Sequence, residues 1–205
     1  MKKLAGAQAG SVTRDTKRSF METTVTKKTW TEKELLSLPK NGHKHELIHG
    51  ELIMVPAGME HENIVIKLSA VLEKFVSEHK LGSVFGSNAG YWMKSGNLRS
   101  PDVSFISKKR LQGFKRPPKG FFKGSPDFAT EILSPSDTME NLHEKIVEYF
   151  ENDTKLLWVI NPEEQFVLVY HSPRHEKLLR GSDILNGEDI FTGFTFPVSE
   201  LFVEL

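Results

Sequence analysis

The sequence reads Arg-Ser-Pro-Asp-Val-Ser-Phe-Ile at 99–106 and Pro-Asp-Phe-Ala-Thr-Glu-Ile-Leu-Ser-Pro-Ser at 126–136, and these two stretches predict the fold. Each combines the apolar run of a buried strand with one acidic residue, Asp102 or Glu131. A carboxylate in such a run is costly to bury unless it is paired or holds a cation. If the two strands lie side by side, both acids point to one place. We therefore expect Asp102 and Glu131 to form a divalent-metal site.

Length and composition limit the class of protein. The chain has 205 residues, no cysteine and a formal net charge of zero. We expect a disordered basic tail at 1–28 and one domain at 29–205. The lack of cysteine excludes disulfides, zinc–thiolate sites and thiol catalysis. The start of the chain lacks the apolar run of a signal peptide, and no stretch approaches about 18 apolar residues. We therefore expect a cytoplasmic protein without a membrane span.

The hydrophobic pattern alternates between helical and strand periods along the chain. This mixture predicts an α/β (α+β) fold with a mixed central sheet flanked by helices, an N-terminal hairpin and C-terminal edge strands. Thr31 and Glu34 form a capping-box pattern for a short helix that ends at Pro39, and Ser136 or Asp137 is the expected cap of a later helix. The predicted elements are a hairpin at 44–55, helices at 60–79 and 137–151, and strands at 83–87, 90–94, 103–107, 128–133, 156–160 and 166–170.

Three further polar residues fall at positions that we expect to face the core or its margin. Glu51 lies on the predicted inward face of the hairpin, and His61 lies in the first turn of the helix 60–79. Lys145 lies beside the apolar stripe of the helix 137–151, one turn before Tyr149, and its stem can follow that stripe. The predicted catalytic set is Asp102, Glu131, Lys145, Glu51 and His61.

This set of residue types suits the hydrolysis of phosphodiesters. Asp102 and Glu131 would hold Mg²⁺ or Mn²⁺, which neutralises charge on the scissile phosphate. Lys145 would orient or deprotonate the attacking water, or stabilise the transition state. Glu51 would bind a second metal or reach the first through water, and His61 would polarise a water or contact a phosphate.

A basic strip suggests where phosphates bind. Residues 94–123 contain nine Lys and Arg residues but one acid, and the loop 108–124 within this strip is longer than most connectors. A neutral protein can bind nucleic acid through such a strip. The alternative is a solvated loop face. The candidate nucleic-acid-binding residues are Lys108, Lys109, Arg110, Lys115 and Arg116.

Several short motifs occur in order along residues 30–205. They are Glu-Leu-Ile-His-Gly-Glu-Leu at 46–52, His61, Pro-Asp at 101–102, the string at 126–136, Lys145 with Tyr149, and Trp158, Ile160 and Pro162. This ordered set resembles the Uma-two family of restriction endonucleases, in the PD-(D/E)xK, restriction-endonuclease-like superfamily. The superfamily motif has a lysine where this chain has Leu133. The resemblance implies that the lysine has moved to a helix, which assigns its role to Lys145.

Three possibilities follow from the residues and the resemblance. The first is a metal-dependent endonuclease that hydrolyses DNA phosphodiester bonds, for which a homodimer is expected because cutting both strands needs two sites. The second is a catalytically inactive nucleic-acid-binding or assembly module on the same fold. A third is a nuclease fold that binds no nucleic acid.

Structural alternatives remain open for each candidate residue. Asp102 could cap a turn or pair with Arg99, and Glu131 could form only a structural ion pair with Lys145. Lys145 could be solvated, Glu51 could be exposed on the hairpin, and His61 could pack locally.

Overall fold

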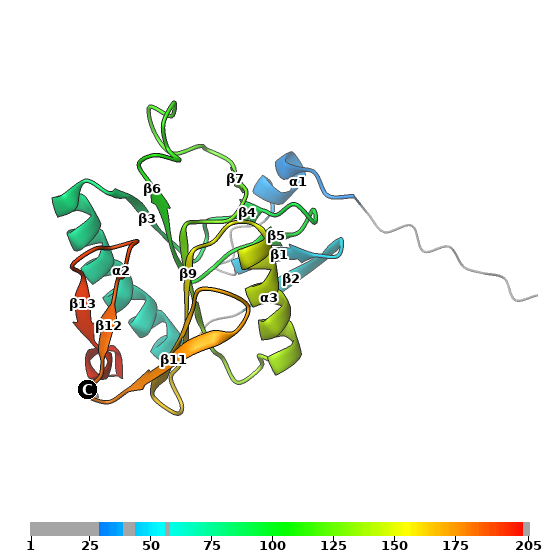
Figure 1. Cartoon of the computed structure of the whole chain (residues 1–205). Coiled ribbons are helices and arrows are strands. Elements are labelled where there is room, and N and C mark those ends of the chain that lie inside the picture. Colours follow the sequence, from blue (N-terminus) through cyan, green and yellow to red (C-terminus); the bar gives the residue numbers. More distant parts are fainter. Residues whose placement is uncertain (1–28, 39–43, 56–57, 203–205) are drawn as a thin grey trace, which may run out of the picture.

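The computed structural model describes residues 29–38, 44–55 and 58–202 (Figure 1). The predicted tail at 1–28 lies outside the described residues. The helices are α1 (Glu32–Leu36), α2 (Met59–His79), α3 (Met139–Glu151) and the 3₁₀ helix η1 (Val198–Phe202). The strands are β1 (Lys44–Ile48), β2 (Glu51–Val55), β3 (Gly82–Gly86), β4 (Tyr91–Trp92), β5 (Leu98–Arg99), β6 (Val103–Ser107), β7 (Phe122–Lys123), β8 (Phe128–Ile132), β9 (Leu156–Asn161), β10 (Phe166–Tyr170), β11 (His175–Arg180), β12 (Ile184–Asn186) and β13 (Thr195–Pro197).

The main sheet has six strands in the order β11-β10-β9-β8-β6-β3. Neighbouring strands are antiparallel except for the parallel pair β8 and β9. The continuous apolar run in β9 is buried, as expected for a strand covered on both faces. The predicted mixed sheet flanked by helices is therefore confirmed.

The two faces of the main sheet bury different clusters. Phe128 and Ile132 of β8 pack in the cluster that contains α2, whereas Ala129 packs in the cluster that contains α3. Figure 1 shows α2 with β12 and β13 on one side of the sheet and α3 on the other. Because successive side chains of a strand alternate between faces, Glu131 points toward α3.

A second sheet positions the N-terminal hairpin. Its strand order is β2-β1-β5-β4-β7, so β1 lies between β2 and β5. His49 and Gly50 both have positive φ at the turn of the hairpin, the backbone that a two-residue hairpin turn requires. Leu47 of β1 packs with Leu35 and Leu98 in a small third cluster. This packing holds β1 against β5 and α1.

The helix ends agree in part with the predictions. The capping box of Thr31 and Glu34 is present at α1. The expected cap of α3 was wrong: Thr138 is the N-cap, and Asp137 instead accepts a hydrogen bond from the backbone N–H of Ser134 at 2.8 Å. None of the helices in the described part of the chain has the length and apolar character needed to span a bilayer.

Candidate active site

The pairing of β6 with β8 brings Asp102 and Glu131 together. Val103 pairs with Thr130, so the register extended by one residue sets Asp102 opposite Glu131. The backbone N–H of Asp102 donates to the carbonyl oxygen of Thr130 at 2.9 Å, which continues the ladder. Asp102 is 2% exposed and Glu131 is 4% exposed. Two buried carboxylates from adjacent strands therefore lie at one end of the sheet.

Two basic residues and one backbone group contact the Asp102 carboxylate. Lys44 donates to Oδ1 at 2.9 Å, the backbone N–H of Ile132 donates to Oδ2 at 2.8 Å, and Nε2 of His61 lies 3.2 Å from Oδ2. Burial alone would raise the pKa of Asp102, but Lys44 and His61 hold this pKa well below its usual range. His61 thus faces the site from the first turn of α2, and Asp102 does not pair with Arg99 in the described contacts.

Helix α3 supplies the partners of Glu131. Lys145 donates to Oε2 of Glu131 at 3.1 Å, and the hydroxyl of Tyr149, one turn later, donates to Oε1 at 2.6 Å. Burial would lower the pKa of Lys145, but Glu131 and Glu46 raise it. Lys145 is therefore a stable ammonium, which suits charge stabilisation rather than proton abstraction. Burial and the nearby Glu131 raise the pKa of Tyr149, so its hydroxyl keeps its proton and positions the carboxylate.

Glu46 is the hairpin acid that lies inside the site. It is 1% exposed, its Oε1 accepts from the backbone N–H of Ser100 at 2.9 Å, and its Oε2 lies 3.6 Å from Nζ of Lys145. The expectation that Glu51 faces inward was wrong, because the Glu51 side chain is exposed. β1 lies between two strands whereas β2 lies at the edge of its sheet, so the inward acid comes from β1.

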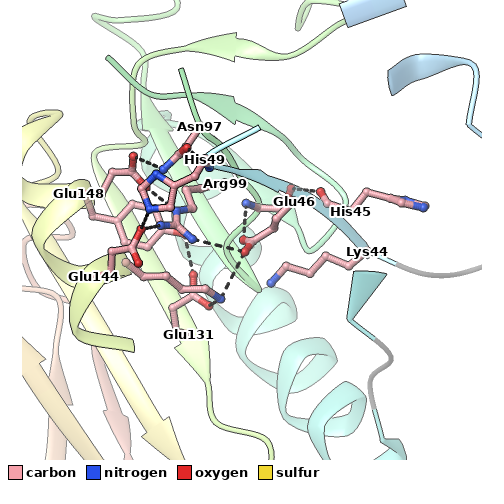
Figure 2. A network of polar contacts seen from close by, with 12 residues as sticks. Lys44, His45, Glu46, His49, Asn97, Arg99, Glu131, Glu144 and Glu148 are labelled. Carbon is pink, nitrogen blue, oxygen red and sulfur yellow. Dashed lines mark hydrogen bonds and ion pairs between the residues drawn. The ribbon is translucent and has the colours of Figure 1, made fainter. Parts of the chain in front are cut away.

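Behind the site, the buried guanidinium of Arg99 links β5 to α3 and β1 (Figure 2). Nε of Arg99 donates to Glu148, Nη2 donates to Glu144 at 3.2 Å, and Nη1 lies 3.8 Å from Glu46. Asn97 also donates to Glu148 at 2.9 Å. Charged groups on β1, β5 and α3 therefore form one continuous network that ends at Lys145 and Glu131.

Of the predicted basic strip, the loop 108–124 lies at the other end of the main sheet, whereas Arg99 lies behind the site. Asp102 directly precedes β6 (Val103–Ser107); from Asp102 to Ser107 the chain extends about 16 Å at 3.3 Å per residue, and the basic loop follows the far end of β6 (Figure 1). Lys108, Lys109, Lys115 and Arg116 are exposed there, and Arg110 lies 3.7 Å from Asp127. The structure does not bring these residues to the acids, and their contact with nucleic acid stays a prediction.

A cavity of about 490 Å³ opens beside His61, between the first turns of α2 and α3. Its lining includes Glu60, Asp137 and Glu163. Three carboxylates repel phosphate, so this hollow does not suit a nucleic-acid backbone.

The chemistry of the donors fits a hard divalent cation. Asp102 and Glu131 offer carboxylate oxygens, and Mg²⁺ is commonly held by one or two carboxylates with water in its other positions. Lys44 and Lys145 already place positive charge on these oxygens. Within the described ranges, no three His, Asp or Glu side chains are grouped so that they could hold a metal ion by themselves. A two-carboxylate site therefore fits better than a three-ligand protein cage.

Sequence reasoning missed Glu46, Lys44, Arg99 and Glu148. Glu46 stands in the quoted motif at 46–52, and Lys44 lies two residues earlier on the same face of β1. An acid and a base at alternate positions of a strand, next to the apolar Leu47 and Ile48, were a usable signal. Arg99 and Glu148 carried no such signal, because their pairing joins residues 49 positions apart.

The fold and the buried acid–lysine cluster together define a nuclease-like α+β protein. A family model described as "Putative restriction endonuclease", Uma2, matches residues 32–199, so the chain belongs to this family. Membership suggests nuclease activity.

A solved structure supports the fold. The crystal structure of a "putative nuclease belonging to DUF820" from Anabaena variabilis is similar with a TM-score of 0.71 and 23% sequence identity. The similarity covers 84% of this chain and 97% of that chain. At this level of identity the likeness shows the fold alone. A comparison with curated proteins gives no match.

Replacing each hairpin glutamate by glutamine in turn distinguishes the effect of the inward acid, Glu46, from that of the exposed acid, Glu51. We expect Glu46→Gln to lower the rate of DNA cleavage by about tenfold or more, because it removes a charge next to Lys145. Glu51→Gln should leave the rate near that of the unmodified protein, because its side chain is exposed. Initial rates of plasmid nicking measure both. Equal losses in the two variants would show that the inward position of Glu46 is irrelevant.

Proposed function

We propose that the protein is a Mg²⁺- or Mn²⁺-dependent endonuclease that hydrolyses DNA phosphodiester bonds at the Asp102–Glu131 cluster. The observation that carries this proposal is the pair of buried carboxylates on adjacent strands, each already neutralised by an ammonium group. Burying such charges costs several kcal/mol per ion, on the order of what full pairing recovers, so these ion pairs add little net stability and a purely structural role explains them poorly. Family membership supports the same class of activity.

Each residue has a role that follows from its contacts. Asp102 and Glu131 would hold the metal, which when bound offsets negative charge on the phosphate and makes a water more acidic. Lys145 stays charged and donates a hydrogen bond toward negative charge that develops on the phosphate oxygens. Tyr149 and Ile132 hold the two carboxylates in place. Glu46 positions Lys145, and His61 contacts Asp102 or a phosphate.

This arrangement is consistent with a PD-(D/E)xK site. Pro101-Asp102 supplies the first acid and Glu131 supplies the second, while Leu133 stands where the motif has lysine. Lys145 reaches Glu131 from α3 instead. Its contact supports the view that a helix now supplies the lysine.

We further propose that the acting form is a homodimer and that the exposed basic residues of the loop 108–124 contact DNA. A single site cuts one strand, and a two-fold pair of sites cuts both. Four of the five candidate basic residues on this loop are exposed, which suits electrostatic contact with a phosphate backbone. The molecular mass in solution and binding of DNA at increasing salt test these two points.

Cleavage of supercoiled plasmid with and without divalent metal tests the proposed function. We expect nicked and linear product with Mg²⁺ or Mn²⁺, and no product when EDTA removes the metal. Ca²⁺ is expected to support retardation of DNA in a gel without rapid cleavage. Retardation that needs no metal, with no cleavage under any condition, would instead support an inactive binding module. Neither cleavage nor retardation would favour a nuclease fold that binds no nucleic acid.

A further inference from the structure

Lys44 is a partly buried basic residue with no role in the proposed reaction. Its side chain is 12% exposed, and its ammonium lies 2.9 Å from Oδ1 of Asp102. Lys44 and Glu46 stand at alternate positions on β1, so both extend from the same face of the strand. Figure 2 shows them reaching toward the part of the site where Glu131 lies.

The two oxygens of Asp102 are engaged differently. Oδ2 accepts from the backbone N–H of Ile132 and contacts His61, so its position is fixed by the ladder and by α2. Among the described contacts, Oδ1 is bound by Lys44 alone. Oδ1 is therefore the oxygen at which a second cation would have to bind.

A divalent ion and an ammonium cannot both bind there at low cost. Like charges a few ångströms apart repel strongly where water is largely excluded. Lysine has a flexible four-carbon stem, and an ammonium is readily hydrated once it reaches solvent. The side chain of Lys44 can therefore leave without movement of β1.

We propose that Lys44 is an internal counter-ion that occupies the metal-binding oxygen of Asp102 in the metal-free protein and is displaced when a divalent metal binds. This inference rests on the proposed function, because it requires a metal at Asp102. It makes Lys44 a determinant of metal affinity: the protein keeps the buried carboxylate neutralised, and metal must compete for it.

Calorimetric titration with Mn²⁺ tests the competition without using activity. We expect Lys44→Met to bind Mn²⁺ about tenfold or more tightly than the unmodified protein, because no ammonium has to leave. The matched control is Lys155→Met, which removes the same charge from another buried aspartate. Lys155 lies 3.3 Å from Asp127 at the opposite end of β8. The Mn²⁺ affinity of the Lys155→Met variant should equal that of the unmodified protein.

The outcomes separate this inference from the proposed function. Equal or weaker Mn²⁺ binding by Lys44→Met, with binding retained by the unmodified protein, overturns the role of Lys44 and leaves the metal site intact. Absence of Mn²⁺ binding in every variant overturns both. Tighter binding in Lys155→Met as well would show a general charge effect and also overturns the inference.

A measurement on the unmodified protein covers the case in which Lys44→Met fails to fold. Acetylation of lysines is followed by mass spectrometry with and without Mn²⁺. We expect Lys44 to be modified slowly without metal and several-fold faster, roughly in proportion to its gain in solvent access, once Mn²⁺ displaces it. Lys155 should react at the same rate in both conditions. An unchanged rate at Lys44 under saturating Mn²⁺ contradicts displacement.

Discussion

Replacing Glu131 with glutamine should lower the rate of plasmid cleavage by about 10²–10³-fold while the protein stays folded. Glutamine keeps the shape of the side chain and one acceptor oxygen for the Tyr149 hydroxyl, which lies 2.6 Å from Oε1. It removes the charge that would hold the metal and that pairs with Lys145. Initial rates in Mg²⁺ and in Mn²⁺ measure the loss, and circular dichroism checks the fold.

The chain contains its own control for this variant. Asp127 follows Pro126 just as Asp102 follows Pro101, and it is also buried. It lies before the first residue of β8, where it accepts from the backbone N–H of Ser107 at 2.8 Å and pairs with Lys155. Asp127→Asn should therefore cleave at the rate of the unmodified protein. If Glu131→Gln keeps most of its activity, the proposed catalytic role of this carboxylate is wrong.

Replacing Arg99 with alanine should lower the free energy of unfolding by about 3–5 kcal/mol, because it leaves the buried carboxylate of Glu148 without its positive partner. Arg99 is 1% exposed and touches Glu148, Glu144 and Glu46. Of these, Glu46 and Glu148 are buried. Urea denaturation measured at neutral pH gives the loss directly.

Two comparisons show whether the loss comes from the buried network. Lys94→Ala removes an exposed cation that lies 3.4 Å from Asp153, and we expect a change of about 1 kcal/mol or less. Adding Glu148→Gln to Arg99→Ala should cost less than the sum of the single changes, because the unpaired charge is then also gone. An Arg99→Ala variant that unfolds at the urea concentration of the parent protein would contradict the network.

The sequence alone was sufficient to predict the strand pair and four members of the cluster, namely Asp102, Glu131, Lys145 and His61. Asp102 directly precedes the apolar run of β6, and Glu131 lies within that of β8, so the cost of an isolated buried charge favours pairing of these strands. His61 and Lys145 could be placed because helical periodicity fixes which face of a helix meets the sheet. These contacts depend on the hydrophobic periodicity within a single helix or strand, which can be recognised from the sequence.

Contacts between distant elements could not be predicted in the same way. Glu46 and Glu51 belong to one short hairpin, and the choice between them depends on the pairing of Leu47 with Leu98, about fifty residues away. The basic loop follows Asp102 closely in sequence, yet the full length of β6 separates them in space. Residues that are close in sequence along a strand can still lie far from one another in space, because each residue of a strand adds about 3.3 Å.

The most direct test is a crystal structure of the unmodified protein with Mn²⁺, located by its anomalous scattering. We predict one anomalous peak in contact with carboxylate oxygens of both Asp102 and Glu131. A peak elsewhere, or none at saturating Mn²⁺, would contradict the claim that these two acids share one ion.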